Sequence, residues 1–260
     1  MDGTTRQDSP ALTARSVVAS ILLGTEPPVL PSRALVRAGA VFGLAEGTVR
    51  TAVSRMVAAG ELHHREDGRY ELTGHLVERQ ARQRASRHSP VGEWSGRWEM
   101  WIVESSAREP TDRAELRRAA HSLRLAELRD GVWLRPDNLD PRRFPEDREV
   151  MSGQCRTFTC HPDDDTSLAD ELWNLQEWSD RALELRREMA PLLVRLSDGD
   201  TDALRPGFLL SAAVLRHLNA DPLLPRELLG RSWQGETLRG DYERYDATFV
   251  AMLRRWLRGE

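Results

Sequence analysis

The segment at 45–59 combines arginine with small hydroxyl residues at helical spacing. One side of the helix that it predicts is apolar, with Ala45, Val49, Ala52, Val53 and Met56. The other side presents Gly47, Thr48, Arg50, Thr51, Ser54, Arg55 and Ala58. Small side chains let a helix backbone approach base edges, and guanidinium groups pair with guanine or phosphate. The pattern predicts a helix that reads DNA, with an ordinary solvated helix face as the alternative.

A β-hairpin is predicted directly after this helix. Residues 61–65 and 69–72 have the composition of short strands, and Asp67-Gly68 between them is a turn signal. Arg65 and Arg69 flank the turn, where they are placed to touch the DNA backbone or minor groove. A hairpin that merely caps the domain is the alternative.

Two earlier helices are expected to hold the DNA-reading helix. Residues 11–23 carry a one-sided apolar stripe, and Ser32 is the predicted N-cap of a helix over 33–42 that ends in a tight turn at Gly43. Helix, turn, helix and hairpin make a winged helix-turn-helix domain at 11–88. A further helix is predicted after Thr73, and its exposed side bears four arginines, namely Arg79, Arg82, Arg84 and Arg87.

A second group of residues could bind a ligand. Tryptophans gather in the middle of the chain, and a structural role for each is the first expectation. The alternative is a tryptophan-lined cleft with arginines, which suits an aromatic acyl-CoA because guanidinium binds phosphate and indole stacks on the acyl ring. This cleft would be formed by Arg97, Trp98, Trp101, Trp133 and Arg135.

No catalytic or metal site is predicted. Cys155 and Cys160 point to opposite faces if their segment is a strand, and there is no second cysteine pair. The three acids at 163–165 lack the spaced ligands of a calcium loop, and we interpret them as a polar turn near a helix N-terminus. Because no phosphate loop, GxSxG or HExxH motif occurs either, we expect no enzyme activity and no cofactor.

The charges are unevenly distributed. The net charge is −4, yet residues 1–90 hold 12 arginines against 9 acids, and every one of the 37 basic residues is arginine. A positive end on an acidic body is typical of a modular DNA binder. We expect a cytoplasmic protein for three reasons. The chain has only two cysteines, no apolar run long enough to span a membrane, and no recognisable signal peptide.

The rest of the chain predicts two further regions. Strands at 98–103, 132–134 and 155–160 with a helix at 111–125 suggest a ferredoxin-like α+β module at 95–165. Helices at 168–195, 206–218 and 234–257 form a predicted C-terminal helical domain at 167–260. Tyr242, Tyr245, Phe249, Met252, Leu253 and Trp256 form a stripe on the last helix that is expected to be core or dimer contact. The fold class is α+β, mostly α.

Several segments resemble the PaaX family of transcriptional repressors, which control phenylacetic-acid catabolism. The resemblance is carried by residues 14–17, 42–44, 48–57, 96–98, 126–136 and 220–225, and then by Leu228, Leu229 and Trp233. Trp173-Asn174-Leu175 matches a further family element. Seven and ten residues beyond this leucine, where the family usually has aromatics, this chain has Ala182 and Leu185. If those aromatics contact the effector in relatives, this protein recognises a different effector; if they are core residues, only the packing has changed.

The resemblance implies a homodimer, joined in part by the middle module, that binds a palindromic operator in double-stranded DNA. It also implies release of the operator by a small effector such as phenylacetyl-CoA or another acyl-CoA. A DNA-binding regulator without a small effector is one alternative. An acyl-CoA-binding protein or enzyme with a vestigial winged helix is another, which the lack of a catalytic constellation disfavours.

Overall fold

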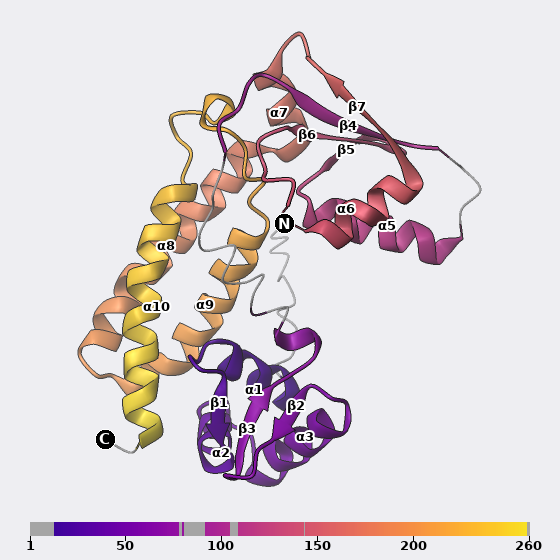
Figure 1. Cartoon of the computed structure of the whole chain (residues 1–260). Helices are drawn as coiled ribbons and strands as arrows, with labels where there is room; N and C mark the ends of the chain where they lie inside the picture. The colour runs from indigo at the N-terminus through magenta and orange to yellow at the C-terminus, as the bar shows by residue number, and fades with distance from the viewer. Residues whose placement is uncertain (1–12, 78–79, 81–91, 105–108, 143, 259–260) are drawn as a thin grey trace, which may run out of the picture. The chain divides into compact units, whose positions relative to one another are not determined.

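The computed structural model describes residues 13–77, 80, 92–104, 109–142 and 144–258. It is a mostly helical α+β structure with two small sheets (Figure 1). The chain divides into two compact units. The first holds Met1–Ser86, Arg187–Leu215 and Asp241–Glu260, and the second holds Arg87–Arg186 and Arg216–Gly240. Residues of the predicted helical region at 167–260 therefore belong to both units.

Three helices form the start of the first unit, as predicted. They are α1 (Ala14–Leu23), α2 (Ser32–Val41) and α3 (Glu46–Ala58). Thr13 caps α1 by accepting a hydrogen bond from the Ser16 backbone N–H at 3.1 Å. The prediction that Ser32 is an N-cap is wrong, because Ser32 is already helical and the cap position is Pro31, which makes no side-chain cap bond.

The turn between α2 and α3 depends on two glycines. Gly43 has φ +71°, the left-handed conformation that ends α2 at little cost only when the residue is glycine. A Cβ on Gly39 would lie 2.4 Å from Cγ2 of Val49, far inside van der Waals contact. The missing side chain of Gly39 therefore lets α2 and α3 pack closely.

A three-stranded antiparallel sheet completes this part of the unit, in the order β1-β3-β2. The predicted hairpin is present as β2 (Leu62–His64) and β3 (Arg69–Leu72), with Gly68 at φ +75° in the turn. The strand β1 (Val29–Pro31) was not predicted. Leu22, Leu35, Val53, Leu62 and Leu72 are among the buried residues of a core shared by the helices and the sheet. We call residues 13–77 the head.

Four antiparallel strands form the sheet of the second unit, in the order β5-β6-β4-β7 (Figure 1). The elements follow one another as β4 (Trp98–Val103), α5 (Pro110–Ser122), β5 (Ala126–Arg129), β6 (Val132–Pro136), α6 (Pro145–Gln154) and β7 (Cys155–Cys160). The strands predicted at 98–103, 132–134 and 155–160 are present, whereas β5 and α6 were not predicted.

The two faces of this sheet have separate cores. One face packs against α5 and α6 through Trp101, Leu116, Trp133 and Met151. The other face carries Trp98 and Leu134 and packs against Ala169, Leu224 and Leu228. Cys155 belongs to the first core and Cys160 borders the second, so the prediction that the two thiols face opposite sides is confirmed.

The remaining elements are helical. They are α7 (Asp165–Trp173), α8 (Leu175–Ser197), the 3-10 turn Thr201–Ala203, α9 (Leu204–Asn219), the 3-10 turn Arg226–Leu228 and α10 (Gly235–Arg258). One continuous helix over 168–195 was predicted, but Asn174 is left-handed at φ 46° and separates α7 from α8. In the first unit Tyr245 of α10 is fully buried and donates a hydrogen bond to the Gly207 carbonyl of α9 at 2.9 Å.

A stack of three rings lies in the second unit. The indole of Trp178 in α8 lies between His217 and Trp233, with ring centroids 4.2 and 4.3 Å away. A ring nitrogen of His217 is 2.9 Å from the Trp178 carbonyl oxygen. Burial lowers the pKa of His217 below its ordinary value, because the charged imidazolium would lose its water.

Candidate nucleic-acid interface

The two sides of α3 differ in the way that its sequence predicts. Val49, Val53 and Met56 are buried in the core of the head, and the prediction that Ala45 also faces inward is wrong because it is the exposed N-cap of the helix. All seven residues on the side of α3 that is predicted to read DNA are exposed, namely Gly47, Thr48, Arg50, Thr51, Ser54, Arg55 and Ala58. The structure therefore brings this set together on one open helix face.

The two arginines of this face differ in how they are held. Arg50 forms an ion pair with Glu46 one turn earlier at 2.7 Å, and both side chains are about 60% exposed. Among the described residues, Arg55 has no ion-pair or hydrogen-bond partner for its side chain. Glu46 is the one acid in the helix. An anion that approached this face would therefore meet Arg55 directly and would compete with a carboxylate for Arg50.

The hairpin presents its two arginines beside the turn. Arg65 pairs with Glu71 at 3.2 Å, and Arg69 donates a hydrogen bond through Nη2 to the Val29 carbonyl of β1 at 3.2 Å. Asp67 fixes the turn by accepting from the Arg69 backbone N–H at 3.1 Å. Both guanidinium groups are exposed but anchored. The arginines predicted to follow Thr73, at positions 79, 82, 84 and 87, lie outside the described residues.

An ion pair that sequence reasoning missed ties α1 to the start of the hairpin. The Glu61 side chain is only 7% exposed and binds the Arg15 guanidinium, whose Nε lies 3.0 Å from Oε2. This hydrogen bond holds the pKa of Glu61 below its ordinary value, against the opposing effect of burial. The two residues are 46 positions apart, so no local pattern reveals the pair.

The five residues predicted to line a ligand cleft do not share one surface. Trp98 is fully buried on one face of the large sheet, and its Nε1 donates to Asp165 at 2.7 Å. Trp101 and Trp133 are buried on the opposite face, where they are directly paired across strands β4 and β6. Arg97 is exposed and pairs with Asp137 at 3.2 Å. In this arrangement the tryptophans are core residues.

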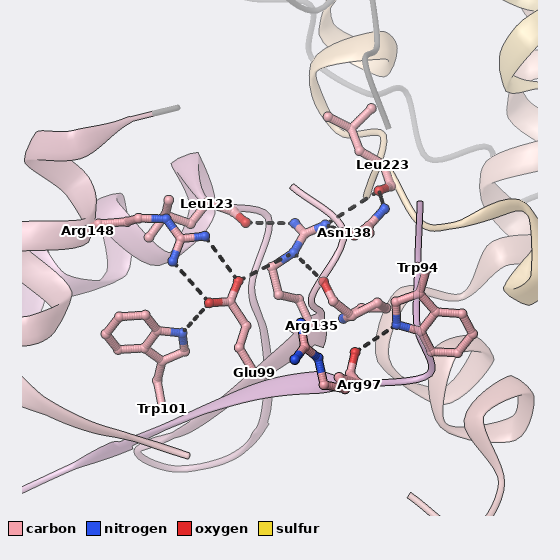
Figure 2. Close-up of polar contacts among 10 residues, drawn as sticks. Trp94, Arg97, Glu99, Trp101, Leu123, Arg135, Asn138, Arg148 and Leu223 are labelled. Atoms are coloured by element: carbon pink, nitrogen blue, oxygen red, sulfur yellow. Dashed lines mark hydrogen bonds and ion pairs between the residues drawn. The ribbon is translucent and has the colours of Figure 1, made fainter. Parts of the chain in front are cut away.

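Arg135, the fifth of these residues, is completely buried. Its guanidinium donates to the Leu123 carbonyl at 2.8 Å, to Oδ1 of Asn138 at 2.7 Å and to the Leu223 carbonyl at 3.4 Å (Figure 2). Burial lowers the pKa of Arg135 to about 9, which leaves it charged at neutral pH. Its donors hold three separate segments of the second unit together instead of facing a cleft.

A carboxylate beside Arg135 completes this network. Glu99 lies 3.7 Å from Arg135 and 3.1 Å from Arg148, and it accepts a hydrogen bond from the Trp101 indole at 3.2 Å (Figure 2). Two guanidinium groups and an indole N–H thus surround one nearly buried carboxylate. This arrangement pairs the charges internally, so that removing one partner would leave a nearly buried charge uncompensated.

The acids at 163–165 form a turn before a helix, as predicted. Asp164 is the N-cap of α7 and accepts from the backbone N–H and hydroxyl of Ser167 at 2.9 and 2.7 Å. These hydrogen bonds hold the pKa of Asp164 below its ordinary value. Within the described residues, no group of three or more histidine, cysteine or acidic side chains is placed to hold a metal ion.

Two models of one family match the chain. The model described as PaaX-like protein matches residues 13–76, and the model described as PaaX-like protein C-terminal domain matches residues 173–258. Together they cover more than half of the chain, in the expected order. The chain belongs to the PaaX-like protein family. The resemblance found in the sequence is thereby confirmed, and the family's domains indicate a transcriptional regulator.

A solved structure is similar over nearly the whole length. It is the uncharacterized protein Rv0674 from Mycobacterium tuberculosis, with 37% sequence identity and a TM-score of 0.73. The match covers 93% of this chain and 97% of that one. No curated protein matches the chain. Within the described part of the chain, every helix is too short or too polar to cross a lipid bilayer.

Proposed function

We propose that this PaaX-like protein is a sequence-specific DNA-binding repressor and that its head is a winged helix-turn-helix with α3 as the recognition helix. The observation that carries the proposal is the exposed face of α3, where hydroxyl residues and arginines gather and Glu46 is the one acid of the helix. A solvated helix face without such a role more often carries long acidic and basic side chains in mixture.

Each exposed residue has a role in this proposal. Thr51 and Ser54 are short enough for the helix backbone to approach the floor of the major groove, with Thr48 beside them. Arg55 and Arg50 contact base edges or phosphates, and Arg65 and Arg69 hold the DNA backbone from the hairpin. The supporting features are the close α2–α3 contact at Gly39, which positions α3 in the head, and the Arg15–Glu61 ion pair, which joins α1 to the start of the hairpin.

The proposed repressor is a cytoplasmic homodimer on a palindromic operator. Each recognition helix enters one major groove, with half-sites about one helical turn apart. The second unit has the β-α-β-β-α-β element order of a ferredoxin-like module, which we assign to dimerisation. The function involves no catalysis.

The proposed effector is an aromatic acyl-CoA such as phenylacetyl-CoA, which would weaken operator binding by favouring a state of the dimer with lower DNA affinity. Family membership supports this class of effector. Because Trp98, Trp101 and Arg135 are buried, we do not assign the binding of this effector to those side chains. A regulator without a small effector is the second candidate, and the same experiment separates the two.

The test is a gel-shift titration at fixed salt on the DNA upstream of the protein's own gene cluster, with and without phenylacetyl-CoA. Specific DNA binding that is lost on addition of phenylacetyl-CoA supports both the operator and the effector. Specific binding that is unchanged by phenylacetyl-CoA supports the second candidate, a regulator without a small effector. Arg55→Ala is expected to weaken specific binding by about 1–3 kcal/mol. The matched control is Arg142→Ala, which removes an exposed arginine of the second unit. Equal binding by both variants would refute the assignment of α3.

A further inference from the structure

The two edges of the sheet in the second unit are built differently. At one edge, β5 is four residues long, its pairing with β6 shifts register between Glu127 and Arg129, and both of these residues are charged. A short, bulged and charged strand is a common protection against pairing with another chain. At the other edge, β7 pairs with β4 over six consecutive residues with no shift.

The outer side of β7 lacks this protection. No described strand lies beyond it, so alternate backbone N–H and C=O groups of β7 face away from the sheet. Thr157, Phe158 and Thr159 are exposed and uncharged, and Phe158 is 45% exposed. Arg156 is the one charged residue of the strand, and it is paired with Glu104 at 2.7 Å. A regular, exposed edge of this kind is able to accept another strand.

We propose that β7 pairs antiparallel with β7 of a second copy of this chain, with Phe158 facing Phe158 across the two-fold axis. This inference rests on the dimer in the proposed function and names its interface. A two-fold axis perpendicular to a sheet places one residue opposite itself. With Phe158 at the axis, Thr157 faces Thr159 of the second copy and Arg156 faces Cys160, so no like charges meet.

The pairing extends two four-stranded sheets into one continuous sheet. In this register residues 156–160 of the two strands overlap, and the outward backbone groups of Thr157 and Thr159 allow about four new hydrogen bonds, while the two phenylalanine rings meet on one face. Strand pairing alone buries less surface than the 1,200 Å² or so that a stable interface covers. Self-association is therefore expected in the range of about 1–100 µM, with a contribution from DNA when both heads are bound.

The first experiment measures the mass of the full-length protein by sedimentation over that concentration range, without DNA. Phe158→Asp places two carboxylates opposite each other and is expected to shift the dimer to monomer, with the fold retained in circular dichroism. The matched control is Leu128→Asp, which changes a 40% exposed residue on the protected edge strand β5 and is expected to leave the dimer intact.

The second experiment tests the register by cysteine cross-linking with diamide. Directly facing residues have Cβ atoms close enough for a disulfide, so Phe158→Cys is expected to give a covalent dimer. Thr157→Cys is expected to give none, because position 157 faces position 159. Absence of the Phe158→Cys product would overturn the pairing, as would a dimer that survives Phe158→Asp.

A wild-type protein that stays monomeric at every concentration would also overturn the inference and would leave the edge to a strand of a different protein. These outcomes are read without DNA, so they are separate from the proposed function. Operator binding by a monomeric protein would refute the interface and leave the DNA-reading head intact. Loss of operator binding in Arg55→Ala, with the dimer unchanged, would support the DNA-reading head independently of the proposed dimer interface.

Discussion

Replacing Glu46 with glutamine is expected to tighten DNA binding while making the head less stable. Glu46 stands in the first turn of α3 and holds the Arg50 guanidinium at 2.7 Å on the face that we propose to read DNA. Glutamine is close to glutamate in size but carries no charge. The change therefore frees Arg50 for phosphate and removes the one carboxylate of this helix.

The magnitude follows from the exposure of the pair. Both side chains are about 60% exposed, and an exposed pair at this helical spacing contributes about 0.3–0.5 kcal/mol. A carboxylate about 8 Å from a phosphate in water adds about 0.5 kcal/mol of repulsion. The sum of about 0.8–1 kcal/mol corresponds to a Kd about four- to fivefold lower. Loss of an acid from the helix N-terminus costs about 0.3–1 kcal/mol of folding free energy.

The assay is fluorescence anisotropy with labelled operator DNA at one salt concentration, together with urea denaturation of the free protein. Glu236→Gln is the matched control, because Glu236 is also a first-turn acid paired with an arginine, Arg226, at 3.7 Å. That variant is expected to lose stability without gaining affinity. Unchanged or weaker binding by Glu46→Gln would refute the placement of this helix end against DNA.

Three further predictions concern packing, burial and pH. Gly39→Ala is expected to lower the unfolding free energy by about 1–2 kcal/mol in urea denaturation, because overpacking against Val49 exceeds the gain in helix propensity. In a Val49→Ala background the same change is expected to be stabilising. Equal effects in both backgrounds would contradict the contact between Gly39 and Val49. Arg135→Met is expected to cost about 3–5 kcal/mol by leaving buried acceptors unpaired, against less than about 1 kcal/mol for the exposed control Arg97→Ala. The pKa of His217 is lower in the folded chain than its ordinary value of 6.5, so just below pH 6.5 the unfolded chain binds more protons than the folded chain. The free energy of unfolding is therefore expected to fall as the pH drops below 6.5, and to fall less steeply in His217→Gln. Parallel pH profiles for the two proteins would exclude His217 as the cause.

The sequence allowed the head to be predicted because its signals are local. The apolar spacing of α3, the left-handed glycine at 43 and the Asp67-Gly68 turn each act within a few residues, and each is present. The strand β1 was missed because three prolines at 27, 28 and 31 are typical of a broken chain. The strand lies at a sheet edge, where a proline without an N–H is tolerated.

The residues of the second unit were harder to interpret because their environment depends on distant parts of the chain. The alternation of β4 places Trp98 and Trp101 on opposite faces, but the sequence does not show that both faces are covered. In the sequence Arg135 resembles a ligand-binding cation, because its hydrogen-bond acceptor, the Leu223 carbonyl, is 88 positions away along the chain. The break at Asn174 was missed because asparagine gives a weaker signal than glycine for a left-handed residue.

The ring stack around Trp178 has an optical consequence. Its three members come from α8, from α9 and from the segment before α10, and the emission of an indole depends on the groups in contact with its ring. Detachment of any one of the three segments would therefore change the fluorescence of Trp178. Subtracting the spectrum of a Trp178→Phe variant isolates this signal from that of the other seven tryptophans. The second unit thus contains a dye-free probe that would report whether a candidate effector rearranges it.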